Sequence, residues 1–219
     1  MIEPRRDGQR RPLRTLPLVT FGPVLLAIAG LVHPRGLSAA TAHRWEHLHI
    51  VLLPVFPLLA LGFAVLLRGR PRADLPGVAK VVTWVCACVY AIGYTALDAV
   101  AGIAAGVVAG QHGEPGELRR LVLALYDTGD RLGQIGVYAF LAAVLAGTVA
   151  LGVEHGLRTL PGTAVLLGAG FSFIDSHIFA PRGVLTMVAI AAGFALWVWA
   201  TAKPVGAPAP TTGADAAHE

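Results

Sequence analysis

The sequence predicts an all-α integral membrane protein, a bundle of about six transmembrane helices with one interfacial amphipathic helix. Of its 219 residues, 55% are hydrophobic and only 14% are charged, whereas soluble domains carry roughly 25% charged residues. The charges stand in short clusters between long apolar runs. Such runs predict membrane helices, because about 20 helical residues span a hydrocarbon core of roughly 30 Å.

Six apolar runs carry this prediction. The first follows a basic start, as a secretory signal does, but no Ala-x-Ala-like site closes it, so we expect a retained helix. Pro54 and Pro57 predict a kink in the second run. The third is too long for one upright span, since it would form about 50 Å of helix. The runs cover residues 17–32, 50–67, 78–110, 132–153, 163–180 and 184–202.

The longest polar connection, residues 111–131, contains the predicted interfacial helix. Leu118, Leu121, Val122 and Leu125 recur there at helical spacing, which is typical of a helix lying at a membrane surface. The chain then divides into a basic tail (1–16), a single six-helix domain (17–202) and a Pro-, Ala- and Thr-rich tail (203–219). We expect the second tail to be disordered.

The basic residues predict an orientation. If the N-terminus is cytoplasmic, eleven Lys and Arg residues lie inside and six lie outside, which places both termini in the cytoplasm. The Arg-, Ala- and Gly-rich composition is typical of a GC-rich bacterial genome, so we expect a multi-pass protein of the bacterial inner (cell) membrane. The net charge of +4 therefore reflects the lipid bilayer as partner, and no motif indicates nucleic acid.

Small residues predict one helix-packing face. Gly102, Gly106 and Gly110 stand four apart, so they line one face of a helix and allow a second helix to approach closely. We expect this stripe to offer a contact to a packing partner.

The histidines gather on one side of this topology, and that is the most informative feature of the sequence. Six of the eight fall at the outer face, and imidazole with carboxylate suits Zn, Cu, Fe or Mn. His43 and His47 stand one helical turn apart, and Glu46 between them could orient an imidazole. The bland alternative is a polar interfacial segment anchored by Trp45. The predicted metal ligands are His33, His43, His47 and His177.

Asp98 is the predicted catalytic residue. It lies between apolar residues, and an ionisable group at membrane depth is costly unless it serves a function. A span that starts near residue 78 would place Asp98 at the outer interface, where water could solvate it. A later start would bury it, with His47 or His33 as the expected partner.

Three function classes remain open. The first is a membrane protein, and possible enzyme of unknown substrate, that binds a divalent transition metal or, as a less favoured cofactor, a single outer-face haem. The second is a small transporter or channel subunit, which favours polar groups near the midplane and an internal repeat. The third is a structural or accessory subunit of a membrane complex. Nucleotide-binding loops and Ser-His-Asp signatures are absent.

Overall fold

The computed structural model describes residues 7–202, and their side chains from Arg14 onward. The predicted tail 203–219 and the first six residues of the basic tail lie outside this range. Every regular element among the described residues is a helix. In chain order these are α1 (Asp7–Val32), α2 (Ala42–Leu52), α3 (Leu58–Leu66), α4 (Leu75–Leu97), the π-helix η1 (Asp98–Ala104), α5 (Ala105–Ala109), α6 (Pro115–His155), the 3₁₀ turn η2 (Gly156–Thr159), α7 (Leu160–Ser176) and α8 (Arg182–Thr201).

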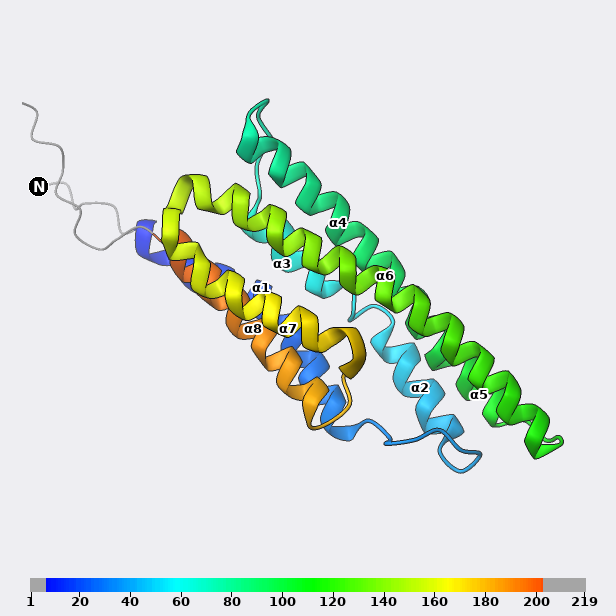
Figure 1. Ribbon diagram of the computed structural model, residues 1–219. Helices are drawn as coiled ribbons and strands as arrows, with labels where there is room; N and C mark the ends of the chain where they lie inside the picture. The colour runs from blue at the N-terminus through cyan, green and yellow to red at the C-terminus, as the bar shows by residue number, and fades with distance from the viewer. Residues whose placement is uncertain (1–6, 203–219) are drawn as a thin grey trace, which may run out of the picture.

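Within residues 7–202, four segments are long and apolar enough to cross a membrane. One of them, Pro115–Ser176, is not straight, because the chain reverses at Gly156 and returns as α7 alongside α6 (Figure 1). Gly156 adopts a φ of 62°, a conformation that glycine reaches without steric cost. The other three are Arg14–Val32, Leu75–Ala109 and Arg182–Thr201.

The predicted second span is two short helices. α2 ends at Leu52 and α3 begins at Leu58, with a run of turns between them. Pro54 and Pro57 lie in this interruption, where each lacks the N–H that a continuous helix would use. The prolines were expected to kink one helix, and instead they separate two. A six-helix bundle therefore does not follow from helix lengths alone.

The predicted interfacial helix is not a separate element. Its residues form the first part of α6, which continues for 41 residues to His155, about 60 Å of helix. α6 runs antiparallel to the continuous helical path α4–η1–α5 (Figure 1). Because the two lie side by side, the apolar positions of 118–125 lie on a long helical pair and not on an isolated helix.

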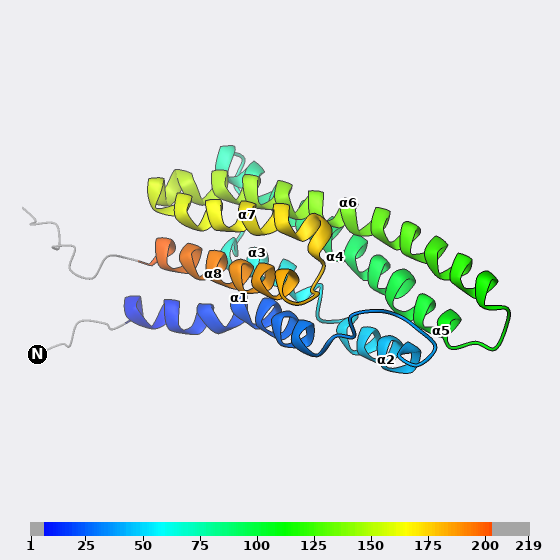
Figure 2. The same cartoon turned by 60° about the horizontal axis from the view of Figure 1, so that its bottom comes forward.

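The molecule consequently has two parts. The long pair is flanked over much of its length by α1, α3, α7 and α8, but at one end it extends past them, and there α2 lies against it (Figure 2). Large aromatic side chains fill the core of the larger part, including Phe63, Tyr90, Phe140 and Trp197, all fully buried. The extension begins where α1 and α7 end, and that boundary is where the candidate site lies.

Candidate metal centre

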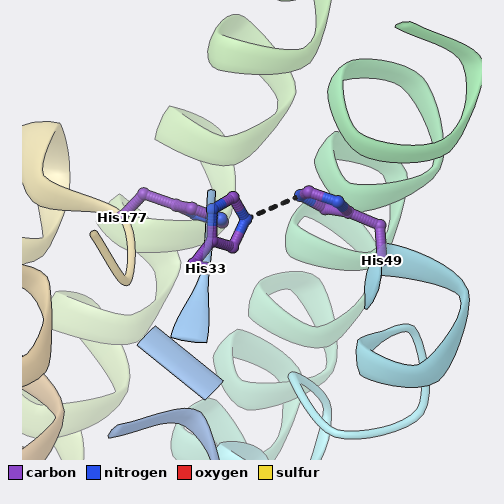
Figure 3. Close-up of side chains that lie close together, drawn as sticks. All are labelled: His33, His49 and His177. Atoms are coloured by element: carbon purple, nitrogen blue, oxygen red, sulfur yellow. Dashed lines mark hydrogen bonds between the residues drawn. The ribbon is translucent and has the colours of Figure 1, made fainter. Parts of the chain in front are cut away.

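Three histidines from distant parts of the chain converge at the boundary between the two parts. His33 directly follows α1, His49 lies in α2, and His177 directly follows α7. Each histidine contributes one ring nitrogen, and these three nitrogens lie within 4.8 Å of one another. The three side chains point toward one another (Figure 3). We call His33, His49 and His177 the histidine cluster.

The rings of His33 and His49 are held in one tautomer. Nδ1 of His33 lies 2.8 Å from the carbonyl oxygen of Pro34, and Nδ1 of His49 lies 2.7 Å from that of Trp45. A carbonyl oxygen only accepts, so each Nδ1 must donate. Each neutral ring then carries its lone pair on Nε2, and these two atoms lie only 3.4 Å apart. Two facing lone pairs repel each other unless a cation lies between them.

His177 is positioned by a hydrogen bond and an unusual backbone conformation. Its Nδ1 is hydrogen-bonded to the Tyr94 hydroxyl at 2.9 Å, and when Nδ1 is the donor the lone pair of the ring is on Nε2. The backbone at His177 has a φ of 44° and a ψ of −134°, a conformation that costs a non-glycine residue on the order of 1–3 kcal/mol. Such strain is typical of residues whose side chain must take one direction.

Asp98 lies beside the cluster as an unpartnered carboxyl group. Its side chain is 0% exposed, and neither carboxyl oxygen has a hydrogen-bond partner. Oδ1 lies 3.9 Å from Nε2 of His49. Asp98 also begins the π-helix η1, and π-bulges inside α-helices are frequent at functional sites. A buried carboxylate without a partner costs several kcal/mol, so this group is either protonated or compensated by a nearby cation.

Aromatic rings enclose the cluster. Trp45 and Phe179 pack edge-on against His33, with ring centroids 4.8 and 4.7 Å away, and Phe56 stacks on His177 at 5.4 Å. These side chains fill the space beside the imidazoles. A single ion therefore suits the cluster better than the planar macrocycle of a haem.

Burial keeps the imidazoles neutral. Desolvation lowers the pKa of His33, against the opposing effect of its hydrogen bond to Pro34. It lowers the pKa of His49 to about 4, against the opposing hydrogen bond to Trp45. Desolvation, together with the neighbouring histidines, also lowers the pKa of His177. Neutral imidazole is the form that binds a metal, so protons compete little for these nitrogens at neutral pH.

The glycine stripe is what admits α2 to this site. A Cβ atom on Gly102 would collide with the imidazole of His49, and one on Gly106 would lie 3.0 Å from Cβ of Glu46. A Cβ atom on Gly110 would make only ordinary contact with Ala42, at 3.5 Å. The face expected to receive a packing partner is therefore covered by α2 of the same chain, and its close approach brings His49 to Asp98.

Two of the four predicted ligands are in the cluster and two are not. His33 and His177 belong to it. His43 and His47 lie on the exposed face of α2, with their rings in contact at a centroid distance of 4.1 Å. The i, i+4 spacing did bring these two together, but on the side of the helix that faces away from Asp98. We call His43 and His47 the exposed pair.

Asp98 was expected either at the outer interface or buried with a partner, and its position has features of both. It lies at the end of α4 where the bundle ends, yet it is buried, because α2 covers it. Its partner is His49 and not the expected His47 or His33. Another aspartate, Asp127 in α6, forms an i, i+4 ion pair with Arg131 at 2.8 Å.

Sequence reasoning missed His49 and Tyr94. The signal for His49 was its helix phase: Ala42, Trp45, His49 and Leu52 are the buried residues of α2, and they recur at intervals of three and four residues. His49 therefore shares a stripe with apolar side chains, whereas His43 and His47 do not. Tyr94 offered no such signal, since its hydroxyl meets a histidine that follows a different helix.

The spacing of His33 and His49 fits one metal ion, whereas the ring nitrogen of His177 lies up to 4.8 Å from theirs and would have to move closer. Two nitrogens bound to a tetrahedral zinc ion at about 2.0–2.1 Å lie about 3.3–3.4 Å apart, close to the 3.4 Å between the Nε2 atoms of His33 and His49. Each of the three rings has its Nδ1 hydrogen-bonded to an oxygen, which is the outer contact that metal-bound histidines usually make.

No protein-family model matches this chain, and no curated protein or solved structure shows significant similarity to it.

Proposed function

We propose that this chain is a membrane metalloprotein in which His33, His49 and His177 bind one divalent transition metal ion, with Asp98 at its side. The observation that carries the proposal is the pair of Nε2 atoms 3.4 Å apart whose rings both donate through Nδ1. A proton between them would make one buried ring cationic, and burial opposes that charge. A metal ion satisfies both lone pairs at once and also neutralises Asp98.

Zinc is the first ion to test. Three imidazoles and a fourth position suit Zn²⁺, whereas Fe²⁺ in oxygenases favours two histidines and a carboxylate. Asp98 Oδ1, 3.9 Å from Nε2 of His49, is near enough to supply the fourth ligand after a small movement. As a ligand it would also balance one of the two charges of the ion, whereas water in the fourth position would leave Asp98 beside the metal as a base.

The membrane location rests on the outer surface of the helices. Leu31, Ile92 and Leu185 are each about two-thirds exposed, on three helices that are long enough to span a bilayer. We propose six crossings, by α1, by α3 with the turn residues before it, and by α4, α6, α7 and α8. α2 and the extension of the long pair then lie outside the lipid.

The proposed orientation follows from charge. The excess of Lys and Arg at the end that carries both termini favours a cytoplasmic location for that end. The histidine cluster is then at the outer face of a bacterial inner membrane, where α1 and α7 leave the bilayer. Metal ions outside the cytoplasm would reach it without crossing the lipid.

An enzymatic role for this centre is the second proposal, and Asp98 supports it. A carboxylate without hydrogen-bond partners beside a metal could accept a proton from metal-bound water. The substrate would have to enter past Trp45 and Phe179, which now enclose the site. Hydrolytic activity lost in Asp98→Asn, at a Zn²⁺ concentration high enough to load the variant fully, would support this role, whereas equal activity in both proteins would remove it.

Metal content tests the main proposal. The full chain, purified in detergent and loaded with Zn²⁺, should hold about one ion, and Co²⁺ loading should give the visible bands of a tetrahedral site. His49→Ala should abolish both signals. His47→Ala, on the same helix but in the exposed pair, should keep them. A wild-type chain that takes up neither ion, or two variants with equal loss, would overturn the proposal.

A further inference from the structure

A cavity with a strongly basic rim lies at the end of the bundle opposite the histidine cluster. It has a volume of about 580 Å³ and lies between the end of α3, the start of α4 and the ends of α6 and α8. Among the residues whose side chains the structure describes, four cations and two carboxylates line it: Arg68, Arg70, Arg72, Lys80, Asp74 and Glu154.

The loop that carries the three arginines is held in place. Gly69, between the first two of them, adopts a φ of +98°, which a larger residue would reach only under strain. The Lys80 ammonium donates to the carbonyl oxygen of Arg68 at 3.4 Å. Gly77 packs so closely on the backbone of Arg72 that no side chain fits there. Asp74 caps α4 by accepting from the Gly77 N–H at 2.9 Å. The arginines therefore sit at one side of the cavity on a fixed loop.

The charges of this rim are not balanced internally. Asp74 is engaged by Arg72 at 3.3 Å, and Glu154 lies beside His155 at 3.8 Å. The guanidinium groups of Arg68 and Arg70 form no ion pair with any carboxylate whose side chain the structure describes. Arg68 and Arg70 thus line the cavity without a carboxylate partner of their own, and phosphate oxygens fit such planar, permanently charged donors in a bidentate manner.

We propose that this cavity binds the phosphate group of an anionic phosphate ester, held by Arg68, Arg70 and Lys80. Leu66, Leu151 and Val198 also line it, so an apolar wall continues from the basic rim toward the helices. A phospholipid presents that combination of phosphate and apolar chain, and basic pockets between membrane helices are suited to anionic headgroups. The lipid as source rests on the proposed membrane insertion, whereas phosphate recognition does not depend on it or on the metal.

The test compares two double variants that remove the same charge. Arg68→Ala/Arg70→Ala removes two cations from the rim of the cavity, and Arg119→Ala/Arg120→Ala removes two exposed arginines at the start of α6. In one arm, the full chain is inserted into nanodiscs that contain phosphatidylcholine and phosphatidylglycerol. The protein is then released from the nanodiscs, and the lipid that stays bound to it is measured by native mass spectrometry. In the other, delipidated chain in detergent is titrated with glycerol phosphate.

We expect retained phosphatidylglycerol to fall at least about tenfold in the first variant, as for the loss of a charge-assisted hydrogen bond, and to stay unchanged in the second. Binding of glycerol phosphate that is lost in Arg68→Ala/Arg70→Ala would support a soluble ester as the source of the phosphate group. Equal retention of phosphatidylcholine and phosphatidylglycerol without binding of glycerol phosphate, or equal losses in both variants, would overturn the proposal. The unaltered metal content of the first variant separates this outcome from failure of the metal proposal.

Discussion

The same short helix, α2, presents two kinds of histidine. His49 is buried against Asp98 and a glycine, and it shares its cluster with residues from two other parts of the chain. The exposed pair, His43 and His47, has closer ring contact but no third ligand. Local spacing therefore brings two rings together, but only burial and tertiary contact produce a preorganised set of ligands.

The largest expected effect separates the two sets by thermal stability. A bound ion at a concentration 1,000 times its Kd stabilises the folded state by about 4 kcal/mol. Zn²⁺ should therefore raise the Tm of the wild-type chain by several degrees, and this rise should vanish in His33→Ala/His177→Ala. In His43→Ala/His47→Ala the rise should persist. Differential scanning fluorimetry in detergent provides the measurement, and a rise that depends on the exposed pair instead would reverse the comparison.

The close approach of α2 can be broken at Gly102. A methyl group there would collide with the imidazole of His49, so Gly102→Ala should destabilise the chain by about 1–3 kcal/mol and weaken metal binding. Gly168→Ala, at an exposed helical position with open space around it, is the matched control and should be neutral or stabilising by up to about 1 kcal/mol. Equal stability of the two variants, followed by chemical denaturation, would show that α2 does not need the glycine.

Asp98→Asn should have opposite effects on the metal-free and metal-bound chains. The substitution removes a buried carboxyl group without partners, so the Tm of the metal-free chain should rise. Loss of the negative charge beside the ion should weaken Zn²⁺ binding by about 10–100-fold. Competition with a coloured chelator measures the affinity. A variant that binds the ion as tightly as the wild type would remove Asp98 from the centre.

The smallest effect is expected at Tyr94. Tyr94→Phe keeps the ring that stacks near His177, at a centroid distance of 5.7 Å, but removes the hydroxyl that holds Nδ1. Zn²⁺ affinity should fall about tenfold, with little change in the stability of the metal-free chain. The same chelator competition measures it, with Tyr138→Phe, an exposed tyrosine on α6, as control. An unchanged affinity would mean that His177 is oriented by its backbone alone.

Much of the helical architecture could be predicted from the sequence, because apolar runs and the residues that end them are local signals. The glycine stripe predicted close helix packing, but the identity of the second helix depends on the reversal of the chain after residue 32. Pro54 and Pro57 predicted an irregularity, yet whether prolines kink or separate helices is decided by what packs around them. The π-helix that begins at Asp98 has no local signal in the sequence, and α2 packs against it.

The histidine cluster was predicted only in part, because local signals identify single residues and not the tertiary contacts between them. His33 was found because it directly follows an apolar run, and His177 because it lies in a polar cluster near the end of the run 163–180, and such ends gather at one level of a bundle. His49 was passed over in favour of the i, i+4 pair, although the phase of Trp45 and Leu52 pointed to the buried face. Periodicity read over the whole of α2 identifies the face that turns inward, and spacing between two histidines does not.

The order in which the ligands appear along the chain has a consequence for biogenesis. His33 follows the first helix, while His177 precedes the last, so the cluster is complete only after nearly the whole chain has been synthesised and its helices have packed together. A nascent protein that emerges helix by helix would pass most of its assembly without the ion. If the cluster binds a metal ion as proposed, loading would be a late maturation event, and it would mark chains whose first and last segments have met.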